Sequence, residues 1–160
     1  MPRSFWRGIK PVQGFSGIAW HMVAAGADPL RPASAPEGRF HHSGQAALYC
    51  SLTVEGTVVA MQRYLRPGDP VRMVVPLTVQ AARLADLRLV REASVVWQDI
   101  RASGAVAPTW AFSDRAREAG AQGMFYASRS RPDLTHLVLF DLSVITGAGA
   151  PQPLPDARNQ

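Results

Sequence analysis

The sequence predicts a single α+β domain, built from short strands with helices on their flanks. Two observations predict this class. The 160 residues fall in the size range of one domain, and apolar runs rich in β-branched and aromatic residues alternate with segments that carry helix caps. The composition is 47% hydrophobic and 18% charged, which is enough apolar material for one core and too little charge for a disordered chain.

The first half of the chain predicts a strand, a long loop, a strand and a helix. Residues 17–23 form an apolar and aromatic run typical of a strand. Residues 29–38 contain three prolines, so they favour a loop over an ordinary helix or a central strand. Residues 46–51 predict the next strand, and Thr53 offers an N-cap for a helix that reaches about Tyr64.

The second half predicts further strands and helices and then an irregular tail. The predicted strands cover residues 71–75, 86–90, 123–127 and 136–140, and the predicted helices cover residues 93–100 and 113–121. The second helix would open at a Ser113 or Asp114 cap and close at Gly120. Residues 146–160 are rich in Gly, Ala and Pro without periodicity, which predicts a loosely ordered surface arm after a domain of residues 1–145.

Charge and cysteine content limit the classes of partner. The 17 Lys and Arg residues against 12 Asp and Glu give a formal net charge of +5, but the positive residues are scattered, so we expect no direct binding to nucleic acid. No window approaches the roughly 20 apolar residues of a membrane span, and the N-terminus lacks a long apolar leader. Cys50 is the single cysteine, which excludes an internal disulfide. These features predict a cytoplasmic protein without membrane attachment.

General catalytic and metal-binding motifs are absent from the sequence. It contains no P-loop, no Gly-x-Gly-x-x-Gly after a strand, no Gly-x-Ser-x-Gly and no Cys/His spacing typical of zinc. His41 and His42 are adjacent, so their side chains diverge in an extended segment, and we expect no metal. The segments that stand out instead are Gly38-Arg-Phe-His-His-Ser-Gly44, Leu48-Tyr-Cys-Ser51 and Gly123-Met-Phe-Tyr-Ala-Ser-Arg-Ser-Arg-Pro-Asp-Leu-Thr-His-Leu-Val-Leu-Phe140.

These segments resemble the RES-domain family over about residues 18–140. Arg39, Gly44 and Tyr49 fall on the places of the family's first motif, with Phe after the arginine where the family usually has Trp. Ser128, followed by a proline-containing loop and a Leu-Val-Leu-Phe strand, matches the family's closing motif without gaps. The resemblance implies a toxin paired with an Xre-type antitoxin, and a fold similar to that of ADP-ribosyltransferases, with a split β core and flanking helices. It also implies that NAD⁺ is the substrate and that the nicotinamide–ribose bond is broken.

The resemblance further implies roles for individual residues. Arg39 would fork onto pyrophosphate oxygens. His21 and Tyr49 look like the pair of the diphtheria-type transferases, in which His holds the adenosine-side ribose and Tyr stacks on nicotinamide. Ser128 would contact phosphate or ribose. From the residues alone, the ordinary alternatives are a surface arginine, a core histidine, a core tyrosine and a turn serine, and the family match is what favours the site roles. Further candidates, which flank the proposed cleft and would add positive potential, are Arg31, Arg129 and Arg131.

Two positions depart from the family pattern. His21 stands where the family most often carries Arg, and Ala60 stands where it carries Glu on the helix after the Tyr strand. Glu55 lies five residues away and Gln62 two residues away, so neither replaces the missing acid unless the register slips at the helix start. Such a slip would bring Glu55 into the site.

The predicted activity is cleavage of NAD⁺ with transfer of ADP-ribose to a cellular protein target. Two alternatives stay open. One is an NAD⁺ glycohydrolase or phosphorylase, with water or phosphate as the acceptor, and the other is an inactive binding module of the same fold. Ala60 favours the inactive module. Arg39, Tyr49 and Ser128 together favour the enzyme, because a bare scaffold needs no such set at cleft-facing strand ends.

Overall fold

The computed structural model describes residues 10–155, which form a sheet of seven strands flanked by helices. In chain order the elements are β1 (Lys10–Ala24), β2 (Leu48–Ser51), α1 (Val54–Met61), β3 (Arg72–Asp86), α2 (Trp97–Ala102), α3 (Thr109–Glu118), β4 (Gly123–Ala127), β5 (Thr135–Leu139), β6 (Ile145–Ala148) and β7 (Gln152–Pro153), with 3-10 turns at Arg91–Ala93 and Leu142–Val144. No helix within residues 10–155 is long and apolar enough to cross a membrane.

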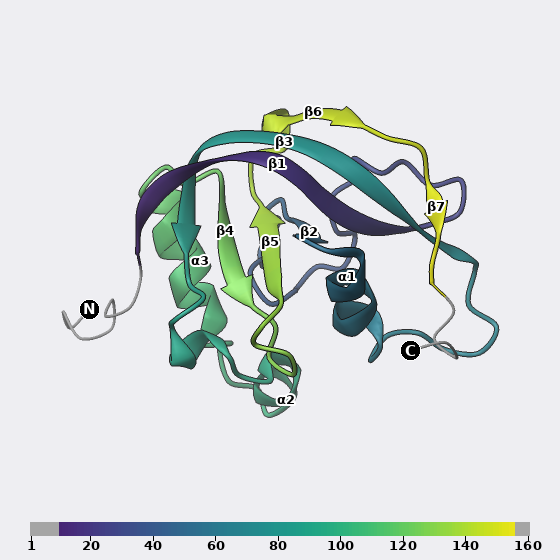
Figure 1. The fold of residues 1–160 in the computed structure, drawn as a ribbon. Helices are drawn as coiled ribbons and strands as arrows, with labels where there is room; N and C mark the ends of the chain where they lie inside the picture. The colour runs from purple at the N-terminus through teal and green to yellow at the C-terminus, as the bar shows by residue number, and fades with distance from the viewer. Residues whose placement is uncertain (1–9, 156–160) are drawn as a thin grey trace.

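The strands form a mixed sheet that closes on itself. Neighbouring strands follow the order β1-β2-β5-β4-β3-β6, and β1 also pairs with β3, so five strands make a closed ring with β6 outside it. The long strands β1 and β3 pair antiparallel from Lys10↔Asp86 to Ala24↔Arg72, and they arch over the shorter β2, β5 and β4 (Figure 1). β3 and β4 pair in parallel. A single-domain mixed sheet with few helices confirms the predicted α+β class.

The ring has two layers that are joined only weakly at one edge. β1 and β3 form one layer, and β2, β5 and β4 form the other. The junction between β1 and β2 rests on a single register pair, Trp20↔Ser51, while the junction between β3 and β4 has three pairs, from Leu84↔Gly123 to Asp86↔Phe125. The likeness to ADP-ribosyltransferases stays a prediction.

Two apolar clusters pack on opposite faces of the β2-β5-β4 layer. The first lies between this layer and β1/β3, and the second lies between this layer and α3. Along β5, Leu137 and Leu139 belong to the first cluster and Val138 to the second, as the two-residue period of a strand requires. All three are 0% exposed, and burying one such side chain stabilises the fold by roughly 1.5–3 kcal/mol.

One end of the face that carries the second cluster is polar. Ser51 of β2, His136 of β5 and Tyr126 of β4 lie side by side in the register of the sheet, and Ser128 follows two residues after Tyr126 on the same face. Ser51, His136 and Ser128 are only 1%, 3% and 4% exposed. Because buried polar groups destabilise a fold unless they are hydrogen-bonded, this row marks the place where the structure departs from simple core packing.

Helix α1 begins as the sequence predicts and ends earlier. The Thr53 hydroxyl caps the helix by accepting a hydrogen bond from the Gly56 amide at 3.0 Å, and the helix ends at Met61 rather than near Tyr64. A side chain at Gly56 would place its Cβ 2.8 Å from the Cβ of Ser51. Glycine at this position therefore lets the first turn of α1 lie directly against β2.

The prediction of two separate strands at residues 71–75 and 86–90 is wrong. The structure has one continuous strand, β3, from Arg72 to Asp86, and residues 87–90 lie outside it. The sequence between the two expected strands includes Pro76 and an alanine pair, which carry little strand propensity. Pairing with β1 over almost the whole length of β3 overrides that weak local signal.

The predicted boundaries of the two later helices are also wrong. α2 starts at Trp97, after the 3-10 turn, rather than at residue 93. α3 starts at Thr109 with Pro108 at its N-cap position, so the expected Ser113 or Asp114 cap lies inside the helix. No side chain caps α3 locally. Its first turn is held by tertiary contacts with the loop after β1, which a search for local cap residues does not detect.

The C-terminal segment is more ordered than the sequence predicts. Residues 145–148 and 152–153 form β6 and β7, and both pair antiparallel with β3. The Gly149 amide also donates a hydrogen bond to the carbonyl of Pro76 at 2.8 Å. The prediction of a loosely ordered arm from residue 146 is therefore wrong for this segment, because the free edge of β3 supplies backbone partners. Residues 156–160 of the predicted arm lie outside the described residues.

Candidate active site

A cavity of about 620 Å³ opens at the polar end of the β2-β5-β4 layer. Its walls come from β1, β2, α1, the loop after β1, residues 95–98 and the ends of β4 and β5. The structure thus brings together the site residues predicted from segments far apart in the sequence. Those that line the cavity are His21, Arg31, Arg39, Tyr49, Ser128 and Arg129.

His21, on β1, presents a ring with one nitrogen that has no hydrogen-bond partner within residues 10–155. Its Nδ1 lies 2.7 Å from the backbone carbonyl oxygen of Tyr49. A carbonyl only accepts, so Nδ1 carries the proton and donates it. Burial lowers the pKa of His21, which favours the neutral ring at neutral pH. Nε2 then keeps a lone pair that can accept a hydrogen bond from a ligand hydroxyl.

The hydroxyl of Tyr49 is the centre of a directed chain of hydrogen bonds. His41 Nε2 donates to the carbonyl of Ala35 at 2.9 Å. Since the Tyr49 oxygen already accepts from a backbone amide, its hydroxyl donates to His41 Nδ1 at 2.7 Å. The Tyr49 oxygen in turn accepts from the Phe40 amide at 3.0 Å. A Cβ at Gly38 would lie 2.3 Å from the His41 ring, so glycine is required there. Tyr49 is anchored through its hydroxyl, and its ring is the part left to act on a ligand.

Arg39 is a largely buried cation without a carboxylate partner among the described residues. Its Nη2 donates to the carbonyl of Ala93 at 2.5 Å, and its guanidinium lies 4.9 Å from the centre of the Tyr126 ring. Burial lowers the pKa of Arg39. Its buried Nε has no hydrogen-bond partner in the described chain. An uncompensated buried charge destabilises the fold, which is consistent with a site kept for an anion.

Positive charge dominates the described lining of the cavity. Five arginines line it against two carboxylates, Asp28 and Glu37, and Glu37 is already paired with Arg101 at 3.0 Å. Within residues 10–155 no ion pair joins any of the five arginines to a carboxylate. The cavity is therefore electropositive and suits an anionic ligand. The arginines are Arg31, Arg39, Arg63, Arg72 and Arg129.

Ser128 is buried at the end of β4 and borders the cavity. Its hydroxyl oxygen accepts from the Arg131 amide at 3.2 Å, which leaves the hydroxyl proton available to a ligand. The side chain of Arg131 instead forms ion pairs with Glu55 at 3.1 Å and with Asp133 at 2.8 Å. Neither Arg131 nor Glu55 lines the cavity.

Helix α1 brings no carboxylate into the site. Ala60, the position of the expected glutamate, lines the cavity, whereas Glu55 and Gln62 do not. Glu55 is half exposed and held by Arg131 on the outside of the molecule. The slipped register that would have placed Glu55 in the cavity therefore does not occur.

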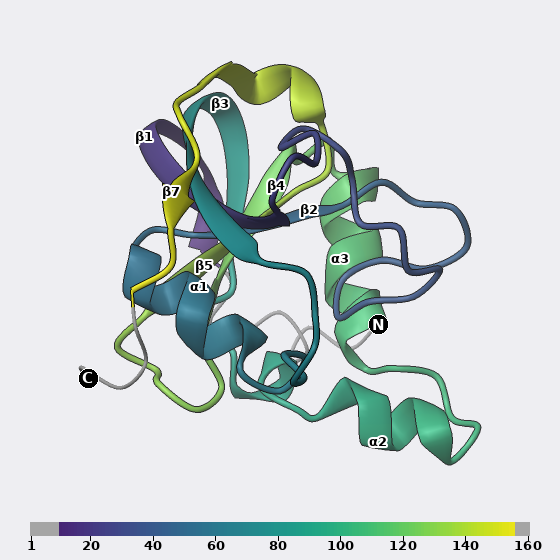
Figure 2. The same ribbon diagram turned by 90° about the vertical axis from the view of Figure 1, so that its right-hand side faces the viewer.

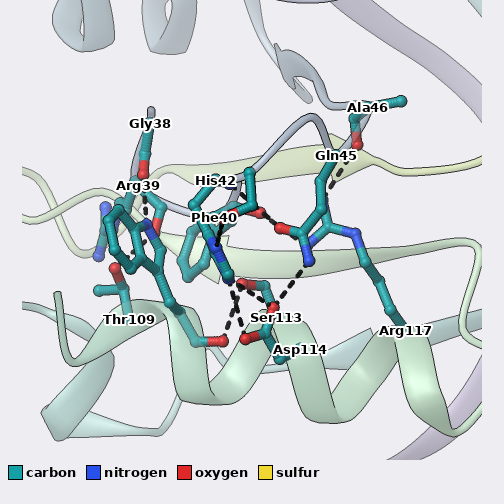
Figure 3. A network of polar contacts seen from close by, with 12 residues as sticks. Gly38, Arg39, Phe40, His42, Gln45, Ala46, Thr109, Ser113, Asp114 and Arg117 are labelled. Atoms are coloured by element: carbon teal, nitrogen blue, oxygen red, sulfur yellow. Dashed lines mark hydrogen bonds and ion pairs between the residues drawn. The ribbon is translucent and has the colours of Figure 1, made fainter. Parts of the chain in front are cut away.

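The loop that carries Arg39 is fastened to α3 (Figure 3). Trp110 Nε1 donates to the carbonyl of Gly38 at 2.8 Å, and the Thr109 hydroxyl donates to the carbonyl of Arg39. Arg117 donates to the carbonyls of Phe40 and Ala46 at 2.9 and 3.0 Å. Figure 2 shows the same loop running beside α3.

Further contacts hold the same loop against α3. Asp114 accepts from His42 Nε2 at 3.0 Å and from the side-chain nitrogen of Gln45 at 2.9 Å. The His42 ring stacks on the Trp110 ring, with 4.6 Å between ring centres. The partners are about 70 residues apart in the chain, so no local pattern identifies them.

Ser51 and His136 are cavity residues that sequence reasoning missed. The Ser51 oxygen lies 2.5 Å from His136 Nδ1, and both residues line the cavity. Burial and the nearby charge of Arg39 lower the pKa of His136 to about 4. The available signal was a polar residue at an inward-facing position of each apolar strand.

Comparison with known proteins assigns this chain to a family. A sequence model of the RES domain matches residues 18–158, and it runs past residue 140 to take in β6 and β7. The chain belongs to the RES domain family, which confirms the resemblance found in the sequence.

A solved structure supports the same fold. A chain in the crystal structure of the M. tuberculosis MbcT-MbcA toxin-antitoxin complex is similar, with a TM-score of 0.59 and 18% sequence identity, covering 89% of this chain and 84% of that chain. At this identity the likeness shows a shared fold. No curated protein matches the sequence.

Proposed function

We propose that this RES-domain chain is the toxin of a toxin–antitoxin pair and acts on NAD⁺ in the cytoplasm. The proposed reaction breaks the nicotinamide–ribose bond and transfers ADP-ribose to a cellular protein. One observation carries the proposal: Arg39, a buried cation without a carboxylate partner in the described chain, shares a cavity with Tyr49, whose hydroxyl is already bonded. The cation suits a pyrophosphate and the anchored ring suits a flat heterocycle. The fold shared with a toxin–antitoxin structure supports the toxin role.

Each lining residue has a role that follows from its free groups. Arg39 would bind pyrophosphate oxygens, with positive potential added by Arg31 and Arg129. The free Nε2 of His21 would accept a hydrogen bond from a ribose hydroxyl, and the Ser128 hydroxyl would donate to phosphate or ribose. The Tyr49 ring would support the nicotinamide. This set positions the dinucleotide and balances its charge, and such positioning is the main demand of the reaction.

The reaction needs no metal and no strong nucleophile from the protein. The bond between ribose C1′ and the nicotinamide nitrogen breaks, and its electron pair stays with nicotinamide, which leaves as a neutral molecule. The acceptor atom of the target protein forms the new bond to C1′ and loses its proton.

Labelled NAD⁺ separates the possible activities. The purified chain is incubated with NAD⁺ labelled in the ADP-ribose part, with and without a cell lysate. Labelled protein in the lysate supports transfer. Free ADP-ribose without lysate identifies a glycohydrolase, and a phosphorylated product formed only with added phosphate identifies a phosphorylase. Binding of NAD⁺ without release of nicotinamide identifies an inactive binding module, for which Ala60 is the specific observation.

We further propose that an Xre-type antitoxin covers the mouth of the cavity. Leu30 and Tyr64 are exposed apolar residues, at 42% and 49%. Tyr64 lines the cavity and Leu30 precedes the lining residue Arg31. An apolar rim beside unpaired arginines suits a partner that offers apolar side chains and a carboxylate. The purified complex should neither bind nor cleave NAD⁺, and the freed toxin should do both. A complex that binds NAD⁺ as tightly as the free chain would place the inhibitory contact elsewhere.

A further inference from the structure

We infer that His136 accepts the proton of the attacking nucleophile through its Nε2 and that Ser51 is its positioning residue. The inference rests on the proposed function, because it assigns one step of NAD⁺ cleavage to a pair of cavity residues. The nucleophile is of the hydroxyl class, either water or the hydroxyl of a target side chain.

The placement of His136 is the first argument. It lies on β5 between Ser51 of β2 and Tyr126 of β4, its ring centre is 5.2 Å from that of Tyr126, and it is 3% exposed. The next inward-facing residue of the same strand, Val138, is in the second apolar cluster. A histidine at such a position is costly to bury, and an apolar residue would continue the core without that penalty.

The hydrogen bonding of His136 is the second argument. Nδ1 is held by Ser51 at 2.5 Å, and nothing in the described chain hydrogen-bonds Nε2. Within residues 10–155, two buried side-chain atoms lack a hydrogen-bond partner, Nε of Arg39 and Nε of Arg72. Because Nε2 is not among them and His136 lines the cavity, Nε2 is accessible from the cavity. One nitrogen is thus oriented by the protein while the other faces the ligand space.

The absence of another suitable base in the described lining is the third argument. Ala60 offers no acid, and Glu37 is paired with Arg101. Asp28 lies in the exposed loop after β1, away from the buried strand ends, and accepts a hydrogen bond from the Leu30 amide at 2.9 Å. His41 has both nitrogens engaged within the protein. His21 keeps a free nitrogen, but its place on β1, bonded to the backbone of Tyr49, suits the holding of a ribose hydroxyl. His136 is neutral at physiological pH because burial and the charge of Arg39 keep its pKa low, so its lone pair is available.

The proposed step balances without any further reactant. In the tautomer that the proposed step requires, the Nδ1–H of His136 donates to the Ser51 oxygen, which leaves the lone pair on Nε2. The hydroxyl oxygen of the nucleophile bonds to ribose C1′ while the bond from C1′ to nicotinamide breaks, and nicotinamide leaves with the electron pair. The proton of the nucleophile moves to Nε2, and the imidazolium then releases it to solvent.

Two variants of His136 test the inference on the full chain. His136→Asn keeps an amide near the position of Nδ1, so it can still bond Ser51, but it removes Nε2. We expect kcat for nicotinamide release to fall on the order of 100-fold or more, with KM for NAD⁺ little changed. His136→Ala should recover turnover when imidazole is added, because the small base can occupy the space that the side chain leaves. Ser51→Ala should lower kcat by a smaller factor, on the order of tenfold.

Controls separate the possible failures. Ser113→Ala removes a buried serine of α3 that bonds the Trp110 carbonyl and does not line the cavity, and it should keep wild-type turnover. His21→Gln should raise KM more than it lowers kcat. If the wild-type chain releases nicotinamide and His136→Asn does so equally fast, the inference is overturned while the proposed function stands. If His136→Asn unfolds, failure of imidazole to rescue a folded His136→Ala overturns it as well. If the wild-type chain cleaves no NAD⁺, both proposals fall.

Discussion

Tyr49 and Arg39 line the same cavity but differ in how far the protein satisfies their polar groups. The Tyr49 hydroxyl has a donor and an acceptor in place, the Phe40 amide and the His41 ring. Arg39 donates to the carbonyl of Ala93 and has a buried Nε without a partner in the described chain. A satisfied group contributes to stability, whereas an unsatisfied buried group is a stability cost that a ligand can remove. Removal of the Tyr49 hydroxyl should therefore lower stability more than activity. Removal of the Arg39 charge should lower activity without lowering stability.

Arg39→Met should separate activity from stability. Methionine keeps much of the side-chain volume and removes the buried charge. Loss of two charge-assisted hydrogen bonds to phosphate, at about 1.5–3 kcal/mol each, predicts a fall in kcat/KM of about 100-fold or more. The free energy of unfolding, measured with urea, should stay constant or rise, since apolar replacement of an unpaired buried ion is often neutral or stabilising. A clearly destabilised variant with normal cleavage would show that Arg39 serves packing.

Tyr49→Phe and Tyr49→Ala should have different consequences. Phe keeps the ring but leaves the Phe40 amide and His41 Nδ1 without their partner, so stability should fall by about 1–3 kcal/mol while nicotinamide release continues. Ala removes the ring, so nicotinamide release should fall while binding of ADP-ribose persists. Calorimetric binding of ADP-ribose and turnover of NAD⁺ give both readings. A Phe variant as inactive as the Ala variant would point to the hydroxyl instead of the ring.

At the scale of elements, helix α3 and the loop after β1 act as one unit. The loop has no regular secondary structure of its own, yet four of its backbone carbonyls accept hydrogen bonds from side chains of α3. Helix α3 lacks a local side-chain cap and gains its N-terminal contacts from the loop. Each segment therefore stabilises the other, and the position of Arg39 depends on both.

Arg117→Ala should loosen this unit. It removes two hydrogen bonds to loop carbonyls and a guanidinium that lies 3.9 Å from the centre of the Phe140 ring. We expect KM for NAD⁺ to rise and the free energy of unfolding to fall by about 1–3 kcal/mol. Glu118→Gln, at an exposed carboxylate of the same helix, is the control and should change neither quantity appreciably. Equal effects of the two substitutions would contradict a specific role for Arg117.

Glu55→Gln should leave NAD⁺ cleavage unchanged. Glu55 lies in the first turn of α1, outside the cavity, and its partner is the exposed Arg131. Exposed ion pairs contribute little to stability, so the melting temperature should also differ little from that of the wild type. A loss of turnover by orders of magnitude at constant melting temperature would show that Glu55 reaches the substrate after all.

At the scale of the whole molecule, closure of the sheet gathers polar groups at one end of a largely apolar barrel. His21, Ser51 and His136 come from β1, β2 and β5, and each lines the cavity. Burial lowers the pKa of both histidines. The ionisable groups that face His136 are Arg39, whose charge lowers its pKa further, and Tyr126, whose own pKa is raised by burial. The fold therefore carries neutral buried histidines, which makes its stability dependent on pH.

The free energy of unfolding should decrease as the pH falls from 6.5 toward 4. The unfolded chain binds a proton at His136 near the usual value of 6.5, whereas the folded chain binds it only at about 4. Acid therefore favours the unfolded state, and the contribution of His136 is fully present above pH 6.5. At about 1.36 kcal/mol per pH unit, the loss is on the order of 3 kcal/mol. Urea unfolding at pH 7 and at pH 4.5 measures it, and His136→Asn should show a smaller loss. A wild-type stability that does not change over this range would contradict the prediction.

The sequence by itself determined the α+β class, most of the strands, the Thr53 cap and the family. Local patterns predict these features. They are apolar runs in the strands, a cap hydroxyl before a helix, and Gly38, Arg39, Tyr49 and Ser128 at motif spacings. The same motifs located Arg39, Tyr49 and Ser128 of the cavity lining, because they lie at strand ends that the fold brings together.

Only the tertiary structure decided the rest. Backbone partners elsewhere in the chain determine the continuity of β3, the start of α3 and the strands β6 and β7. Local propensity does not identify such partners. Ser51 and His136 become a pair only when β2 and β5 align. The exclusion of Glu55 from the cavity depends on the direction of α1 relative to β2. The lack of a carboxylate partner for Arg39 among residues 10–155 depends on what surrounds it in three dimensions.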